Sequence, residues 1–271
     1  YKALIEQTTT TDMSAEQIHR IGLDEVERIR QDMLEIKRKV GFEGSLKAFF
    51  DHLRTDPQFK FASKQALLDG YDAIRSRVDA AVPKLFTLTP RSPFEIRPVP
   101  EYSERSQAAG YYRPGTPDGS RPGIFFVNTY DLPSRTTPRM ETLFLHEAIP
   151  GHHFQIALAQ ENESLPNFMR FDGNTAFAEG WALYAESLGP ELGMFTDPYQ
   201  AFGSLDDEML RAIRLVVDTG IHARGWSREQ AIRYMLDNSA QSETDARAEV
   251  ERYIAIPGQA LAYKVGALTI R

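Results

Sequence analysis

Apolar residues recur at helical spacing along most of the chain. Between Ile18 and Leu34 they return every three or four positions, which predicts an amphipathic helix over residues 14–38. Ser14 precedes this run and Gln17 follows three residues later, a pairing typical of a capping box at a helix start. The same spacing predicts further helices over residues 44–54, 63–81, 138–160, 174–188, 199–224, 227–238 and 242–255, and a last one after Pro257-Gly258. The helix of residues 138–160 is expected to be broken or bulged at Pro150-Gly151.

Residues 83–138 break this pattern. They are rich in proline and in turn signals such as residues 116–119, TPDG. Two short segments have the character of strands: residues 94–97, FEIR, and residues 123–128, GIFFVN. We therefore expect a Pro-rich β/loop subregion within a single domain of residues 1–271, containing a small irregular antiparallel sheet. The fold class that follows is mostly α, of the α+β type.

Composition limits the classes of function. The net charge is −7 and no cluster of lysine and arginine suits a phosphate backbone, so no nucleic acid is expected as a partner. No apolar run approaches the roughly 20 residues of a transmembrane segment. The chain has no cysteine, which removes disulfides and thiolate metal sites. Because it begins at Tyr1 without a signal-peptide pattern, we expect a soluble fragment or processed form, and periplasmic, secreted and cytoplasmic locations stay open.

Three of the six histidines lie in residues 145–155, LHEAIPGHHFQ. A zinc-binding helix of the His-Glu-x-x-His type has its second histidine four residues after the first, but here that position is Pro150. In an uninterrupted helix, His152 would lie on a different face from His146. His153 would share the face of His146 but lie about 10 Å further along the axis.

The proline changes this interpretation. Pro150 cannot donate to the carbonyl of His146, and Gly151 relaxes the backbone beside it. A bulge that loops out two residues would bring His152 to the place of the fourth residue, with Glu147 as the base beside the first ligand. The alternative is that Pro150 and Gly151 end the helix and that no metal binds.

A second stretch supplies carboxylates. In residues 174–186, NTAFAEGWALYAE, Glu179 lies early in a predicted helix among apolar neighbours, where a carboxylate is costly unless it is paired or bound to a metal. The alternative is an exposed first-turn glutamate that the helix dipole favours. Glu186 follows seven residues later near the same face, either as a hydrogen-bond partner of a ligand or as a solvated side chain.

The two stretches together resemble zinc metallopeptidases. His146-Glu147, a Gly-His pair and an Ala-Glu-Gly-Trp-Ala helix are similar to the thermolysin-like gluzincin superfamily (clan MA), in which a glycine often precedes the second histidine ligand and here favours His152. The chain also resembles, more closely, the bacterial domain-of-unknown-function 885 family. That likeness covers HEAIPGHHFQ, AFAEGWALYAE, RLVVDTGIHARGWSREQAI (residues 214–232) and RYIAIPGQALAYKVG (residues 252–266). Members are usually longer at the N-terminus, so the chain is similar to a C-terminal, catalytic half.

The resemblance implies a helical zincin-like domain, a peptide substrate and one Zn²⁺ ion held by His146, His152 and Glu179. Glu147 would take a proton from the attacking water and pass it to the leaving amine. His153 is an alternative ligand or an oxyanion donor. Further candidate oxyanion donors lie in the C-terminal segments that carry the resemblance: Tyr253, Tyr263, His222 and Arg252.

Substrate contacts are expected upstream. A peptide could add as an extra strand to the edge of residues 123–128, although their apolar run also fits a core strand. Candidate cleft residues are Tyr112, Arg113, Arg121 and Asn128, the arginines as holders of a substrate carboxylate. Two other functions stay open. One is a metal-dependent hydrolase of a non-peptide amide, and the other is a non-catalytic helical binding protein whose structural zinc is closed by His153.

Overall fold

The computed structural model describes residues 1–271 and divides them into two compact units. The first unit contains Tyr1–His52, Asn174–Gly180 and Leu205–Arg271, and the second contains Leu53–Gly173 and Trp181–Ser204. Three helices pass from one unit into the other, which are α3 (Leu46–Thr55), α8 (Thr175–Ser187) and α9 (Pro198–Arg224).

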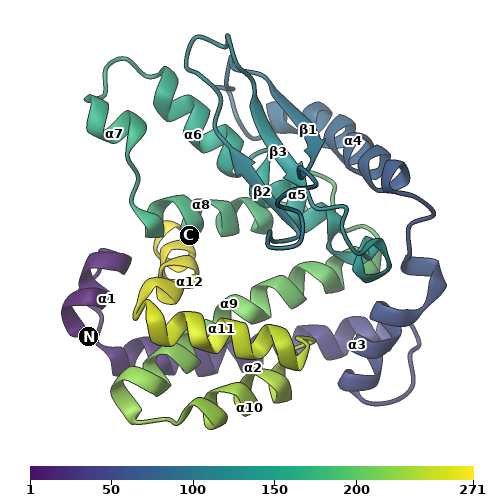
Figure 1. Cartoon of the computed structure of the whole chain (residues 1–271), viewed down its shortest axis with the longest axis vertical. Coiled ribbons are helices and arrows are strands. Elements are labelled where there is room, and N and C mark those ends of the chain that lie inside the picture. The colour runs from purple at the N-terminus through teal and green to yellow at the C-terminus, as the bar shows by residue number, and fades with distance from the viewer. The chain divides into compact units, whose positions relative to one another are not determined.

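The first unit is helical (Figure 1). Besides its parts of α3, α8 and α9 it contains α1 (Lys2–Thr9), α2 (Ala15–Lys39), α10 (Arg228–Asn238), α11 (Glu243–Ala255), the 3-10 turn η5 (Gln259–Leu261) and α12 (Ala262–Ile270). The capping box predicted for α2 is confirmed, because Ser14 accepts from the backbone of Gln17 and the Gln17 side chain bonds back. A small buried core joins α1, α2, α9 and the C-terminal segment through Ile5, Ile18, Leu215, Leu261 and Val265.

The second unit contains a three-stranded sheet of β1 (Phe94–Pro98), β2 (Gly110–Arg113) and β3 (Gly123–Val127), in the order β1-β3-β2. β2 runs antiparallel to β3, but β1 runs parallel to it. The sheet is therefore mixed, and the prediction of an antiparallel sheet holds for one pair only. The β2 strand, of four residues, was not predicted because it is too short to show a clear alternation.

β3 is the central strand, and all five of its residues are buried. Both of its edges are already paired, so a peptide cannot add to residues 123–128 as an extra strand. That prediction was wrong, and the alternative of a core strand is confirmed.

Three helices pack near this sheet (Figure 1). α4 (Lys64–Ala81) contacts β1, whereas α5 (Met140–Glu147) and α6 (His152–Glu161) contact β2. Their shared core includes Tyr71, Val78, Phe94, Phe125, Phe144, Leu145 and Phe154. Since α5 precedes and α6 follows residues 148–151, this core holds the chain on both sides of that segment.

The remaining elements of the second unit are short: η1 (Pro57–Phe59), η2 (Val82–Lys84), η3 (Leu132–Ser134), η4 (Thr137–Arg139) and α7 (Asn167–Phe171). The predicted helices are present within a few residues of their expected bounds, and the break expected as one possibility at Pro150-Gly151 divides residues 138–160 into two helices. α1 and α7 were not predicted. None of the helices combines the length and apolar character that a membrane crossing requires.

Candidate metal centre

Of the two forms that the sequence leaves open at Pro150-Gly151, a break or a bulge, the structure has the break, which is a bend between two helices. α5 ends at Glu147, and α6 begins at His152. Between them the Ile149-Pro150 peptide bond is cis, and Gly151 lies directly against the end of α5. A Cβ atom at Gly151 would be only 1.9 Å from the carbonyl oxygen of His146, so a side chain cannot be placed there. Because of this bend, the start of α6 lies beside the last turn of α5.

This bend brings two histidines together. The imidazole rings of His146 and His152 lie 4.7 Å apart between their centres, at an interplanar angle of 87°. Glu179 of α8 joins them, and one ligand atom from each of the three residues lies within 4.8 Å of the others. His146 is buried, and His152 and Glu179 are half-buried. The three residues that the resemblance implies as ligands are therefore adjacent in the structure.

The α8 helix determines where Glu179 lies. It is one continuous helix, and its residues from Trp181 onward belong to the same unit as the histidines. Trp181 donates from its indole Nε1 to the carbonyl oxygen of Pro150 at 2.7 Å, which ties α8 to the bend. Because an α-helix is rigid over two residues, this contact also fixes the backbone of Glu179.

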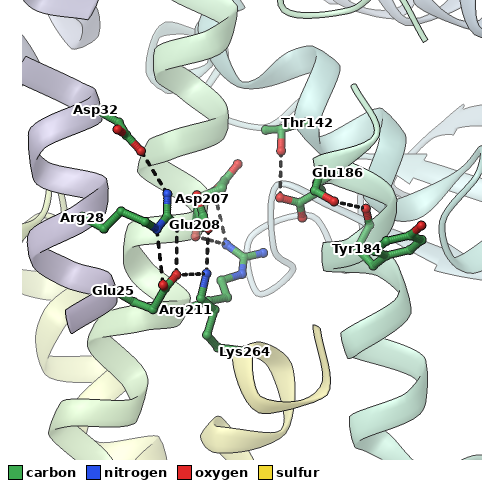
Figure 2. A network of polar contacts seen from close by, with 11 residues as sticks. Glu25, Arg28, Asp32, Thr142, Tyr184, Glu186, Asp207, Glu208, Arg211 and Lys264 are labelled. Carbon is green, nitrogen blue, oxygen red and sulfur yellow. Dashed lines mark hydrogen bonds and ion pairs between the residues drawn. The ribbon is translucent and has the colours of Figure 1, made fainter. Parts of the chain in front are cut away.

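A second carboxylate on α8 orients the first histidine. Nδ1 of His146 is 2.6 Å from Oε1 of Glu186. Thr142 donates to Oε2 of the same carboxylate at 3.0 Å (Figure 2). Glu186 is only 7% exposed, so it is not a solvated side chain. Its contact with Nδ1 makes Nε2 the nitrogen with which the His146 ring would coordinate a metal.

His153 lies in a different environment from His152. Its Nδ1 is 2.9 Å from the hydroxyl of Tyr112, and its ring centre is 4.6 Å from that of Phe94. Burial, assisted by the positive charge of Arg75, lowers the pKa of His153 to about 4, so this imidazole is neutral at ordinary pH. The structure places it with Tyr112 of β2 and outside the group of His146, His152 and Glu179.

The donor set can be compared with what a zinc ion needs. Two imidazole nitrogens and one carboxylate oxygen are ligands that zinc accepts, and three protein ligands leave a coordination position for water. The carboxylate behind His146 is a usual companion of such a ligand. Glu147, the last residue of α5, is 8% exposed and follows His146 directly. The residues present therefore fit a zinc ion.

The four C-terminal candidates share a polar network in the first unit. Tyr253 is 1% exposed; its hydroxyl donates to Glu249 and lies 3.2 Å from Nε of Arg214. His222 places Nε2 3.0 Å from the carbonyl oxygen of Tyr253. Two further contacts complete the network: Arg252 donates to Gln259 and Glu249, and the Tyr263 ring lies 4.5 Å from the guanidinium carbon of Arg214.

Sequence reasoning missed Glu249 and Arg214, which hold this network together. A signal existed for Arg214, since it interrupts an otherwise apolar run of α9, residues 212–217. A charged residue at a core position of a helix requires a buried partner. No comparable pattern marks Glu249, which lies on a helix with many charged residues.

The candidate cleft residues hold loops and strands of the sheet subregion. Asn128 is 1% exposed and donates to the carbonyl oxygens of Glu104 and Gln107 at 2.8 and 2.9 Å. Arg121 donates to the carbonyl oxygen of Pro114 at 2.8 Å. Arg113 lies over the ring of Phe126 at 5.5 Å, and Tyr112 contacts His153 as described. A role of these four residues in binding substrate stays a prediction.

Two solved structures are similar to the chain. A crystal structure of a candidate lipoprotein from Colwellia psychrerythraea has 40% sequence identity and a TM-score of 0.95, with 100% of this chain and 47% of that chain covered. The structure of a candidate lipoprotein of unknown function from Shewanella oneidensis has 24% identity and a TM-score of 0.78, with 100% and 52% covered, and shows the fold alone. The chain thus spans about half the length of these structures.

Comparison with protein families gives one match, and comparison with curated proteins gives none. The family model described as "Bacterial protein of unknown function (DUF885)" matches residues 1–271, over the same stretches in which the bend, Glu179 and Glu186 lie. With its whole length matched, the chain belongs to the DUF885 family of bacterial proteins.

Proposed function

We propose that the chain is a zinc-dependent metallopeptidase of the gluzincin type that hydrolyses peptide bonds of short peptides. The observation that carries the proposal is the convergence of His146, His152 and Glu179 within 4.8 Å, with Glu186 bonded to the first of them. A structural helix junction has no need for two imidazoles and two carboxylates at one point.

Each residue has a role that follows from its place. A zinc ion bound by His146, His152 and Glu179 supplies a Lewis acid that polarises water and the substrate carbonyl. Glu147 accepts the proton of the attacking water and delivers it to the leaving nitrogen, which requires a carboxylate beside the ligands but not among them. Glu186 keeps the His146 ring in one orientation and one tautomer.

The oxyanion of the tetrahedral intermediate needs a hydrogen-bond donor in addition. Among the four candidates, Tyr263 is the strongest, because Arg252 already donates to Gln259 and Glu249. The hydroxyl of Tyr253 is held by Glu249 and Arg214, and Nε2 of His222 is directed at a backbone carbonyl.

One of the competing functions is disfavoured by a specific contact. A structural zinc site would need a fourth protein ligand, and His153 was the expected one. Since His153 is bonded to Tyr112, the group has three protein ligands, as catalytic sites have. A metal-dependent hydrolase of a non-peptide amide would use the same residues, and only substrates distinguish it from a peptidase.

The test is a substrate panel of blocked di- and tripeptides and of simple non-peptide amides, assayed with zinc-loaded protein, chelated protein and the Glu147→Gln variant. We expect peptide hydrolysis that the chelator abolishes, that added zinc restores, and that Glu147→Gln reduces by a factor of 100 or more. Glu163→Gln, an exposed glutamate after α6, is the matched control and should keep wild-type activity. Hydrolysis of the amides alone would replace the peptidase proposal, and full activity of Glu147→Gln would remove that residue as the base.

A further inference from the structure

Two helices of the first unit meet backbone to backbone at the segment that carries Glu179. A Cβ atom at Gly180 of α8 would lie 2.5 Å from the carbonyl carbon of Gly266 in α12 and 2.6 Å from its Cα. In the other direction, a Cβ atom at Gly266 would lie 2.1 Å from the carbonyl oxygen of Ala176 and 2.9 Å from the Cα of Gly180. Neither glycine can therefore carry a side chain unless one of the two backbones moves.

The α12 helix is firmly held at this contact. Lys264 is 4% exposed, and its ammonium group lies 2.7 Å from Glu25 of α2 and 2.6 Å from Glu208 of α9 (Figure 2). Val265 belongs to the buried core that joins α12 to α1, α2 and α9. Because these two residues directly precede Gly266, a displacement at the contact falls mainly on α8.

Such a displacement reaches the proposed metal ligand. Glu179 directly precedes Gly180 and follows Ala176 by three residues, so the contact with α12 lies on both sides of it along α8. Carbon atoms need about 3.5 Å between them, so a methyl group at Gly180 would push α8 away by about 1 Å. Metal ligands have to be held to within about 0.5 Å, and a helix moves as a rigid unit over so few residues.

We propose that Gly180 and Gly266 are positioning residues for the metal ligand Glu179. The inference rests on the proposed zinc site and adds α12, which also carries the oxyanion candidate Tyr263, to the elements that determine its geometry. Two successive residues of α8 then locate the ligand. Gly180 lies against α12, and the side chain of Trp181 donates to the bend that carries the histidines.

The experiment measures metal affinity and metal coordination in folded variants. Competition with a chromophoric chelator gives the zinc affinity, and the visible spectrum of the Co²⁺-loaded protein reports the ligands and their geometry. In Gly180→Ala and Gly266→Ala we expect the zinc affinity to fall about tenfold or more. Their Co²⁺ spectra should shift toward that of Glu179→Gln, because the displaced carboxylate no longer reaches the metal.

Gly22→Ala is the matched control. A Cβ atom at Gly22 of α2 would lie 2.8 Å from side-chain atoms of Leu215 and Val216 in α9, which is a tight contact between two other helices of the same unit. All three alanine variants should lose stability toward urea, but Gly22→Ala should keep the wild-type zinc affinity and Co²⁺ spectrum. The same spectral change in all three would show general loosening of the unit and contradict the proposal.

Wild-type affinity and spectrum in folded Gly180→Ala and Gly266→Ala would overturn this inference and leave the ligand set intact. Absence of zinc binding by the wild type, or equal spectra for wild type and Glu179→Gln, would instead overturn the ligand set and the inference with it. Should neither glycine variant fold, Val265→Ala loosens α12 without a clash, and Val250→Ala, at a buried position of α11, is its control. Weaker zinc binding by Val265→Ala alone supports the proposal, and wild-type binding or equal weakening in both contradicts it.

Discussion

Nδ1 of His146 lies 2.6 Å from Oε1 of Glu186, and this contact joins the end of α5 to the helix that also carries Glu179. The two glutamates are seven residues apart, close to two turns of an α-helix, so they lie on one face of α8. One helix thus provides a proposed ligand and the group that orients another proposed ligand. In the proposed metal centre, the relative positions of these two glutamates therefore follow from the regular geometry of one helix.

Replacing Glu186 should weaken metal binding without unfolding the protein. Glu186→Gln keeps the shape of the side chain but loses the negative charge that holds the His146 ring, and we expect zinc affinity to fall 10- to 100-fold. Competition with a chromophoric chelator measures this affinity. Thr142→Val, which removes only the hydrogen bond to the other carboxylate oxygen, should change it less. Equal affinities for wild type and Glu186→Gln would show that the contact does not orient a ligand.

The bend between α5 and α6 should depend on Gly151. In Gly151→Ala the new methyl group would meet the carbonyl oxygen of His146 at 1.9 Å, so the bend must open and His152 must move. We expect a loss of about 3 kcal/mol or more in the free energy of unfolding, together with weaker zinc binding. Urea denaturation measures the first, and Gly173→Ala, with open space around the position, is the control. A stable Gly151→Ala variant with normal zinc affinity would contradict the description of the bend.

The sequence predicted the helices well because each buries one apolar face. The 3.6-residue spacing and the capping residues of α2 were sufficient to predict its start, and the structure agrees. By contrast, the parallel pairing of β1 with β3 depends on contacts between segments distant in the chain, which local patterns do not encode. For the same reason the sequence left open whether β3 is an edge strand or a core strand.

The candidate site also has features that the sequence predicts and features that it does not. The residue types around Pro150 indicated a metal site, and the glycine that follows is essential to the bend, as the sequence suggested. The sequence left a bulge and a helix break open, since both are compatible with the same residues. The partners of Tyr253 and Asn128 were not predictable either, because a buried polar side chain and a substrate-binding one look alike in a sequence.

The different surroundings of the adjacent histidines lead to another prediction. His153→Ala removes a ring packed on Phe94 and leaves the hydroxyl of Tyr112 without its partner, so we expect the free energy of unfolding to fall by about 2–3 kcal/mol. Zinc content should be retained once the variant is folded. Tyr112→Phe, which loses the hydrogen bond alone, should cost about 1 kcal/mol in the same urea titrations. A variant His153→Ala as stable as the wild type would show that this packing contributes nothing.

An ion-pair network in the first unit should make stability depend on acid pH (Figure 2). Burial alone would raise the pKa of Glu25, but its contacts with Arg28 and Lys264 outweigh burial and lower the pKa to about 2. A lowered carboxyl pKa stabilises the folded state above the unfolded pKa of about 4.5, and this stabilisation is lost as the pH falls toward 2.

Glu25→Gln should therefore be less stable than the wild type at pH 7, by at most about 3 kcal/mol, with the difference vanishing between pH 4.5 and 2. Urea midpoints across this pH range measure it. Glu27→Gln, on an exposed position of the same helix, should show no such difference. A gap between wild type and Glu25→Gln that stays constant down to pH 2 would show that this carboxylate does not carry the acid dependence.

The most direct test of the metal centre is the zinc content of the folded protein and of two neighbouring histidine variants, measured by elemental analysis after equilibration with zinc and dialysis. The three-residue group predicts one zinc ion per chain in the wild type and in His153→Ala, and almost none in His152→Ala. Zinc retained by His152→Ala at the wild-type level, or lost by His153→Ala alone, would contradict the assignment of His146, His152 and Glu179 as the metal ligands.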